Sequence, residues 1–224
     1  MLHFLGDGSA FNVDSNNTSA YIKKGDAMIL FDCGERICNV IIKAGILEGI
    51  KRLHLFITHT HSDHIGSLEG FIYYIHYFTD IKLSVYYPHT SRLDKMMRMQ
   101  GLEFEYATLP VPEQVEGYRV DAVRQKHMFG AYGFFFYSDG DSFFFSGDTS
   151  VISKRAKKEL CEGKIDVIYH EVSFSDSPIH TPIADLEKAF PMEIRDKVYL
   201  MHFANDACRE MAAAKGFSVV SVEH

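Results

Sequence analysis

The stretch LHLFITHTHSDHIGSLEGF, residues 53–71, places three imidazoles and one carboxylate within six positions, directly after an apolar run. Leu53, Leu55 and Ile57 recur with a period of two, which predicts a strand buried on at least one face. Apolar residues after His64 recur at helical spacing, so a helix is expected close behind. The polar side chains therefore lie on a loop between a buried strand and a helix, where proteins commonly build functional sites.

The spacing within this loop favours metal binding. His59 and His61 are two residues apart, so both side chains can point the same way in an extended segment. Asp63 and His64 fall at the expected start of the helix and can face a second point. Two such pairs suit two neighbouring metal ions better than one tetrahedral site. The alternative is a solvated, histidine-rich turn that binds no metal.

Composition limits the functions that are open to this chain. It has 224 residues, 46% of them hydrophobic and 24% charged, which is typical of a globular protein with a full core. The formal charge of −7 argues against broad, nonspecific binding to nucleic acids. The four cysteines form no CxxC pair, as expected for reduced thiols. The sequence has neither a signal-peptide pattern nor a membrane-spanning run, so we expect a cytoplasmic protein with no membrane partner.

The order of the expected elements predicts the fold. Short strand-like runs recur along the whole chain with helical stretches between some of them, and FFFYSDGDSFFF, residues 134–145, predicts a hairpin that turns on Asp139 and Gly140. Strands paired as hairpins are followed by strand–helix units, and this order occurs twice. The pattern predicts an α+β protein with an αββα four-layer sandwich, in which two mixed β-sheets lie face to face and helices cover the outer faces. We expect a single domain over residues 1–224.

Two helices in the last third of the chain have recognisable starts. In TPIADLEKAF, Thr181 is the expected N-cap and Pro182 the first helical residue. In NDACREMAAAK, Asn205 is the expected N-cap, and the helix should end before Gly216.

Residues 59–64, HTHSDH, resemble the HxHxDH signature of the metallo-β-lactamase superfamily. Further segments follow in the order expected for the ribonuclease Z-like branch of that superfamily: FLGDGSAF, MILFDCGE with Asp32, KHMFGAYGFFF with His127, FFFSGDT with Asp148, IYHEVSF with His170 and Glu171, and YLMHFAND with His202. The resemblance extends from residue 2 to about residue 205 and therefore covers nearly the whole chain. It implies the metallo-β-lactamase fold.

The resemblance also implies a set of metal ligands. The first ion would be bound by His59, His61 and His127, the second by Asp63, His64 and His202, and Asp148 would bridge both. Asp148 and His202 each follow an apolar strand, as ligands at the mouth of a sheet should. Imidazoles and carboxylates without thiolates suit two divalent ions, with zinc preferred and manganese or iron as alternatives.

The implied chemistry is hydrolysis of a phosphodiester by a hydroxide that bridges the two metals. Asp63 would orient that nucleophile or accept its proton. His170 is the candidate general acid, because imidazole titrates near neutral pH and the matching histidine of the resembling branch lies beside the scissile phosphate. Glu171 would orient His170 or cap a strand. His180, in IHTPIADL, is expected to begin a helix rather than to act in catalysis.

The resemblance to ribonuclease Z is weaker in the segments that would contact the substrate. Ribonuclease Z carries a long arm that binds transfer RNA between the ligands that match His127 and Asp148, but residues 128–147 of this chain suffice only for a two-stranded hairpin. The loop AFNVDSNNTSAY also lacks the proline and arginine usual in the branch. We therefore expect a small-molecule or nucleotide phosphodiester substrate rather than transfer RNA.

Other activities stay open at this stage. The alternatives are hydrolysis of another ester, a thioester or a lactam at the same metal site, cleavage at the 3′ end of transfer RNA, or a metal-binding or sensing module without catalysis. A homodimer is a further expectation, since dimers are common among proteins that this chain resembles.

Overall fold

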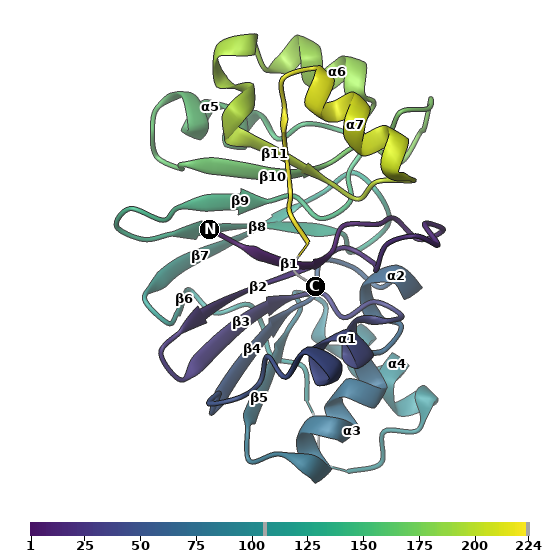
Figure 1. The fold of residues 1–224 in the computed structure, drawn as a ribbon. Coiled ribbons are helices and arrows are strands. Elements are labelled where there is room, and N and C mark those ends of the chain that lie inside the picture. The colour runs from purple at the N-terminus through teal and green to yellow at the C-terminus, as the bar shows by residue number, and fades with distance from the viewer. Residues whose placement is uncertain (105–106, 223–224) are drawn as a thin grey trace.

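The computed structural model describes residues 1–104 and 107–222, and its strands form two mixed β-sheets that lie between two layers of helices (Figure 1). The predicted α+β sandwich with four layers is thus confirmed. The prediction of one domain over residues 1–224 stays a prediction, and positions 105–106 and 223–224 lie outside the described residues. In the described parts of the chain, no helix combines the length and the apolar character needed to cross a membrane.

The first sheet has five strands in the order β1-β2-β3-β4-β5. These strands are β1 (His3–Gly6), β2 (Ser19–Lys24), β3 (Ala27–Phe31), β4 (Arg52–Phe56) and β5 (Lys82–Tyr86). The first three pair antiparallel as consecutive strands, and β3, β4 and β5 run parallel. The parallel part needs crossover connections, and the helices that supply them cover the outer face of this sheet.

The second sheet has seven strands in the order β12-β11-β10-β9-β8-β7-β6. These strands are β6 (Gln114–Val115), β7 (Tyr118–Arg124), β8 (Tyr132–Tyr137), β9 (Phe143–Phe145), β10 (Val167–Glu171), β11 (Val198–Met201) and β12 (Ser218–Val219). The strands from β6 to β9 pair antiparallel and those from β9 to β12 parallel. The predicted hairpin is confirmed as the antiparallel pair of β8 and β9.

The helices divide between the two outer faces (Figure 1). The first sheet is covered by α1 (Ile37–Ala44), α2 (Ser62–Ile65), α3 (Leu68–Phe78) and α4 (Thr90–Gln100), and the second by α5 (Lys154–Cys161), α6 (Ile183–Ala189), the 3-10 helix η1 (Met192–Lys197) and α7 (Asp206–Ala214). The helix predicted after His64 is α3, whose buried face includes Phe71, Ile72 and Ile75.

Three apolar cores hold the layers together, because successive side chains of a strand point to opposite faces of its sheet. In β8, Phe134 and Phe136 face the core between the sheets, whereas Phe135 faces the core under α5 and α7. In β3, Met28 and Leu30 face the core under α1, α3 and α4. Each sheet is therefore buried on both faces.

The predicted helix starts are half right. Asn205 caps α7, since its side chain accepts a hydrogen bond from the backbone N–H of Cys208 at 3.0 Å. Thr181 does not cap α6: Pro182 is the N-cap residue, and the Thr181 hydroxyl donates to the backbone carbonyl of Thr149 at 2.7 Å. Thr181 thus ties the start of α6 to the loop after β9.

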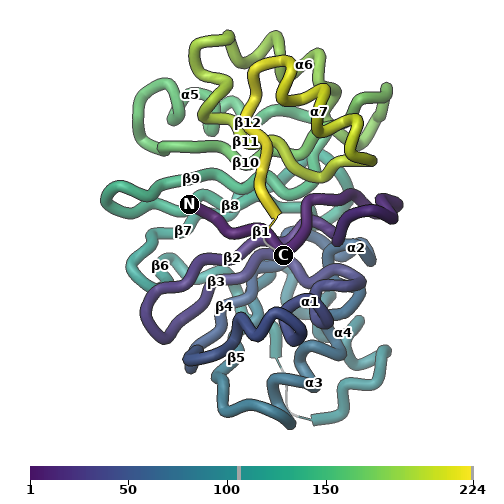
Figure 2. The backbone as a smooth tube through the Cα atoms, viewed as in Figure 1, coloured from purple at the N-terminus to yellow at the C-terminus, as the bar shows by residue number. Residues whose placement is uncertain are grey.

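The two ends of the described chain meet on one side of the sandwich. The segment after β12 leaves the second sheet and runs to β1 of the first sheet (Figure 2), where Val222 forms a parallel bridge with Phe4. Gly8, just after β1, bridges to Phe203, just after β11. These contacts join the two sheets at the edge where β1 and β11 end.

Phe31 lies fully buried at the centre of the core between the sheets, where its ring stacks on Phe145 with centroids 4.8 Å apart and meets Phe136 edge-on at 5.2 Å. We expect Phe31→Ala to lower the free energy of unfolding by about 3–5 kcal/mol, because it leaves a cavity that the surrounding rings cannot fill. Chemical denaturation of the two proteins measures this difference. The matched control is Phe78→Ala on the exposed face of α3, which should change stability by no more than about 0.5 kcal/mol; an equal loss in both variants would contradict the assignment of Phe31 to the core.

Candidate metal centre

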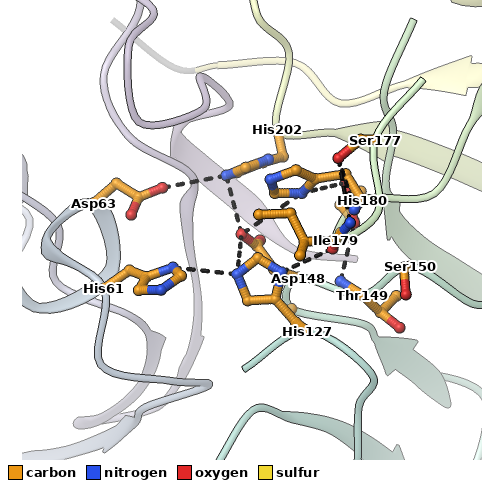
Figure 3. A network of polar contacts seen from close by, with 12 residues as sticks. His61, Asp63, His127, Asp148, Thr149, Ser150, Ser177, Ile179, His180 and His202 are labelled. Carbon is orange, nitrogen blue, oxygen red and sulfur yellow. Dashed lines mark hydrogen bonds and ion pairs between the residues drawn. The ribbon is translucent and has the colours of Figure 1, made fainter. Parts of the chain in front are cut away.

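Polar side chains from several parts of the chain meet at one edge of the sandwich, beyond the carboxyl ends of the strands. His59 and His61 follow β4, His127 follows β7, Asp148 follows β9 and His202 follows β11. Parallel strands end on the same side of a sheet, so loops that are distant in sequence come together there. Figure 3 shows four of these side chains pointing toward one another from both sheets: His61, His127, Asp148 and His202.

Three of the histidines form the first group. The Nε2 atom of His59 lies 3.1 Å from Nδ1 of His61, and Nε2 of His127 lies 3.1 Å from the same Nδ1 atom. The ligand atoms of all three lie within 4.8 Å of one another, as one metal ion would require. This is the set that the sequence assigned to the first ion.

Two carboxylates and two histidines form the second group. Nε2 of His202 lies 3.3 Å from Oδ2 of Asp63, and Nε2 of His64 lies 3.3 Å from the same oxygen. On the other side, His64 Nε2 lies 3.4 Å from Oδ1 of Asp148 and His202 Nε2 lies 3.5 Å from Oδ2. The structure therefore brings together the residues that the sequence assigned to the second ion.

Asp148 lies between the two groups. Besides its contact with His202, Oδ2 lies 3.8 Å from Nε2 of His59 and 3.7 Å from Nε2 of His127. One carboxylate thus faces nitrogen donors of both groups, which is the position that a bridging ligand needs. Although burial raises its pKa, the neighbouring His202 and His64 hold the pKa of Asp148 well below its usual range, so it is ionised at neutral pH.

The chemistry of the donors fits divalent metal ions. Nε2 of His64 and Oδ2 of Asp148 are buried and have no hydrogen-bond partner, as expected for atoms that would bind a cation. Burial lowers the pKa of His59 and of His61, which keeps both imidazoles neutral and their lone pairs available. The set contains no thiolate, so zinc, manganese and iron all suit it, with zinc preferred.

Buried side chains behind the ligands hold them in place. Asp32 accepts hydrogen bonds from the backbone N–H of Thr58 at 2.7 Å, from its hydroxyl at 2.7 Å, and from Nδ1 of His64 at 2.8 Å. The last bond directs Nε2 of His64 toward the second group. On the other side, Nδ1 of His127 donates to the backbone carbonyl of Ile179 at 2.8 Å, which directs its Nε2 toward the first group. The motif MILFDCGE contains Asp32, but no pattern in the sequence indicates that Asp32 would support His64.

Backbone geometry adds to this support. Asp32 and His202 adopt φ values of 59° and 65°, in the left-handed region that non-glycine residues seldom occupy. Gly34 touches the ligand loop so closely that an added Cβ would lie 2.1 Å from the carbonyl oxygen of Asp63. The DCG motif thus positions the second group from behind, and the packing around it must offset the strain.

His180 and Glu171 complete the site. Nδ1 of His180 lies 3.2 Å from Oε2 of Glu171 and 4.0 Å from Oδ2 of Asp148. The imidazole of His180 is 25% exposed, and its ring centroid lies 5.0 Å from that of His127 and 5.3 Å from that of His202. The expectation that His180 only begins a helix missed this position, since α6 starts three residues later.

Glu171 is fully buried and is fixed by the backbone. Its Oε1 accepts hydrogen bonds from the N–H groups of Thr149 at 2.9 Å and Thr181 at 3.2 Å. Burial and the nearby Asp148 carboxylate raise its pKa. Glu171 therefore orients His180 rather than His170. Thr181, which does not cap α6, contributes its backbone N–H to this arrangement.

His170 lies away from the two groups. It shares the face of β10 with Ile168, which packs in the core under α5 and α7, whereas Glu171 points to the opposite face. Its Nδ1 donates to the carbonyl of Glu171 at 2.7 Å, and burial lowers the pKa of His170 to about 4. A neutral imidazole is too weak an acid to protonate a leaving oxygen, and the single N–H of His170 is bound to the Glu171 carbonyl. The general-acid role of His170 stays a prediction, and this geometry does not support it.

Comparison with known proteins shows that the chain matches one protein family over nearly its whole length. The family model described as "Anti-Pycsar protein Apyc1" matches residues 1–223. The anti-Pycsar protein Apyc1 of Paenibacillus harenae is 25% identical over 222 residues, which cover 91% of this chain and 90% of that protein.

Solved structures show a likeness of fold. The metallo-β-lactamase fold protein YhfI of Bacillus subtilis has a TM-score of 0.70 at 15% identity, with 99% of this chain and 95% of that chain covered. The short form of human tRNase Z has a TM-score of 0.70 at 22% identity, with 99% and 96% covered. In sequence, the ribonuclease Z of Haloferax volcanii is 39% identical over 70 residues, which cover 31% of this chain and 22% of that protein. The structures confirm the expected metallo-β-lactamase fold, and this sequence match confirms the expected resemblance to the ribonuclease Z-like branch.

We expect two equivalents of zinc in the wild-type protein, one in His61→Ala and none in Asp148→Ala, because Asp148 faces both groups and His61 only the first. Elemental analysis after zinc loading and dialysis measures these numbers. His76→Ala, which changes an exposed histidine on α3, is the matched control and should keep both ions. Full zinc content in Asp148→Ala would show that this carboxylate binds neither ion.

Proposed function

The chain belongs to the anti-Pycsar Apyc1 family, and from this membership and the geometry of the metal centre we propose that it is a metal-dependent phosphodiesterase that acts on a small nucleotide-type substrate. The observation that carries the proposal is the ionised, buried Asp148 carboxylate between two groups of ligand atoms. Hydrolytic sites with two metals commonly serve the in-line displacement at phosphorus.

Two divalent ions bound in these groups would supply an activated water as the nucleophile and would offset the charge that develops on the phosphoryl oxygens. The first would be held by His59, His61 and His127, the second by Asp63, His64 and His202, with Asp148 facing both. Zinc is the ion that this donor set favours.

Asp63 would orient the attacking water. Its Oδ2 faces Nε2 of His64 and Nε2 of His202 at 3.3 Å each. Although burial raises its pKa, these two imidazoles hold the pKa of Asp63 well below its usual range. A carboxylate that stays ionised at neutral pH would accept a hydrogen bond from the attacking water and orient it, whereas its low pKa makes it a weak base.

His180 donates the proton that the leaving oxygen needs. The hydrogen bond from its Nδ1 to Glu171 leaves Nε2 as the free ring nitrogen, and its partial exposure gives a substrate access. Glu171, held by two backbone N–H groups, fixes the orientation of the His180 ring through this hydrogen bond. The proposal therefore gives His180 the role that the sequence suggested for His170.

Transfer RNA is the weaker substrate hypothesis. The likeness to tRNase Z is one of fold, and residues 128–147, between His127 and Asp148, contain β8, β9 and short connections. This segment leaves no room for the arm that the ribonuclease Z resemblance would require. The acidic net charge of −7 also disfavours a polyanionic substrate.

We expect the metal-loaded protein to hydrolyse 3′,5′-cyclic mononucleotides and bis(p-nitrophenyl) phosphate, and to lose both activities when a chelator removes the ions. A transfer-RNA precursor and p-nitrophenyl acetate should not be cleaved. Chromatography of the products and release of p-nitrophenol measure these rates. Cleavage of the acetate without cleavage of any phosphodiester would replace this proposal with a carboxylic ester hydrolase, and loss of metal without any activity to lose would favour a binding module.

We expect His180→Ala to lower kcat about 10²- to 10⁴-fold on a nucleotide phosphodiester, because an alkoxide leaving group needs a proton. The loss on bis(p-nitrophenyl) phosphate should be much smaller, since nitrophenolate leaves without protonation. Steady-state kinetics of the wild type and of His180→Ala on both substrates measure this contrast.

The matched control is His170→Gln, which should show no contrast between the two substrates once the folded fraction is taken into account. Equal losses on both substrates in His180→Ala would rule out a general acid at this position. A contrast that appeared in His170→Gln instead would restore the original assignment.

A further inference from the structure

Thr58 is fully buried at the point where β4 ends and the loop with the first ligands begins. Its backbone contacts both sheets, because its N–H donates to Oδ1 of Asp32 at 2.7 Å and its carbonyl accepts from the N–H of Tyr132 in β8 at 2.9 Å. Its methyl group lies against Gly147, where an added Cβ would be 3.0 Å from the methyl carbon. Valine could make all of these contacts, so the hydroxyl of Thr58 needs a separate explanation.

The hydroxyl lies between the buried Asp32 carboxylate and a ligand of the first group. Its Oγ1 atom is 2.7 Å from Oδ2 of Asp32 and 3.1 Å from Nδ1 of His59. A hydroxyl has one hydrogen to donate and lone pairs with which to accept. Since Asp32 serves as the acceptor here, the hydroxyl donates to it and accepts a hydrogen bond from Nδ1–H of His59.

The same carboxylate oxygen also holds a ligand of the second group. Oδ2 of Asp32 accepts from Nδ1 of His64 at 2.8 Å. One oxygen is thus connected to His64 directly and to His59 through the Thr58 hydroxyl. All four side chains are buried, so bulk water does not compete for these hydrogen bonds.

The hydrogen bond from His59 to Thr58 decides which ring nitrogen of His59 can bind a metal ion. Nε2 of His59 faces the first group, 3.1 Å from Nδ1 of His61 and 3.8 Å from Oδ2 of Asp148. A hydrogen held on Nδ1 leaves the lone pair of Nε2 free for the ion. Without the hydroxyl, Nδ1–H would lose this acceptor, and the ring could adopt the other tautomer, in which Nε2 carries the hydrogen and cannot coordinate.

We propose that Thr58 is a positioning residue for the first ion, whose hydroxyl fixes the tautomer and the ring orientation of His59, and that Asp32 thereby anchors one ligand of each ion. The inference goes beyond the proposed function, because it concerns how the chain binds its ions and applies to any substrate. Neither Thr58 nor Asp32 takes part in the bond-breaking step.

Zinc affinity, measured by competition with a chromophoric chelator, tests this proposal without turnover. We expect Thr58→Val to weaken the binding of one of the two ions about 10- to 100-fold, the range typical of a lost hydrogen bond behind a metal-binding histidine. Thr58→Ser keeps the hydroxyl and removes the methyl group, so it should bind both ions nearly as the wild type does.

The His61→Ala background shows which ion is affected, because only the ion of the second group is expected to bind there. Thr58→Val should leave the affinity for that ion unchanged, since the bond from His64 to Asp32 remains. Asp32→Asn should weaken it, because the amide offers one acceptor oxygen where the carboxylate offers two.

Thr60→Val is the matched control. Thr60 lies in the same loop and is buried, and its hydroxyl oxygen has no hydrogen-bond partner within the described chain. This variant should bind both ions as the wild type does. Unchanged zinc affinity in Thr58→Val would overturn the proposal. An equal loss in Thr58→Ser would assign the effect to the methyl group, and an equal loss in the His61→Ala background would assign it to a general loosening of the loop; either result also overturns the proposal.

A measurement on the wild type keeps the test independent of how well the variants fold. Nitrogen-15 spectra of the histidine rings in the zinc-free protein show which ring nitrogen carries the hydrogen. We expect His59 to carry it on Nδ1 before any ion is bound, and a hydrogen on Nε2 instead would overturn the proposal. Because neither measurement involves turnover, the result does not depend on whether phosphodiesters are cleaved.

Discussion

The buried carboxylate of Asp148 is the constraint on which the rest of the site depends. It lies 2% exposed, ionised, and within 4 Å of imidazole nitrogens from three separate loops. A charged group in such a place is unfavourable unless cations or hydrogen bonds offset its loss of hydration. The same carboxylate raises the pKa of His64 and of His202, although burial lowers it, and divalent cations bound between the two groups would replace those protons as the compensating positive charge.

The sandwich provides the rigidity that such a site needs. Three apolar cores bury both faces of both sheets, and the ligand loops begin where the buried strands end. The packing also maintains strained backbone conformations at Asp32 and His202, both of which lie in the left-handed region. The contact between Gly8 and Phe203 further ties the first sheet to the strand end that carries His202. Ligands from both sheets can therefore keep their spacing when no ion is bound.

Successive residues of β10 point to opposite faces of the second sheet, and only one of these faces is directed toward the metal centre. His170 and Glu171 are neighbours in β10, but strand geometry turns one toward the helices and the other toward the metal centre. The chain then returns through residues 172–179, so that His180 meets Glu171 from outside. The same returning segment forms one wall of a cavity that Phe11, His180 and His202 also line. The position of His180 and the shape of this cavity thus depend on one loop.

The fold class and most of the candidate metal ligands could be predicted from the sequence. Alternation in residues such as Leu53, Leu55 and Ile57 indicated buried strands, and the spacing within HTHSDH indicated candidate ligands, because both signals are local. His127, Asp148 and His202 could be named only through a family resemblance, since nothing local brings them together. Three features depend on the tertiary structure alone: His180 rather than His170 faces the site, Asp32 supports His64, and Phe11 borders the cavity that His180 and His202 also line. Each of these depends on which way a side chain points after distant segments have packed, and no pattern along the chain records that direction.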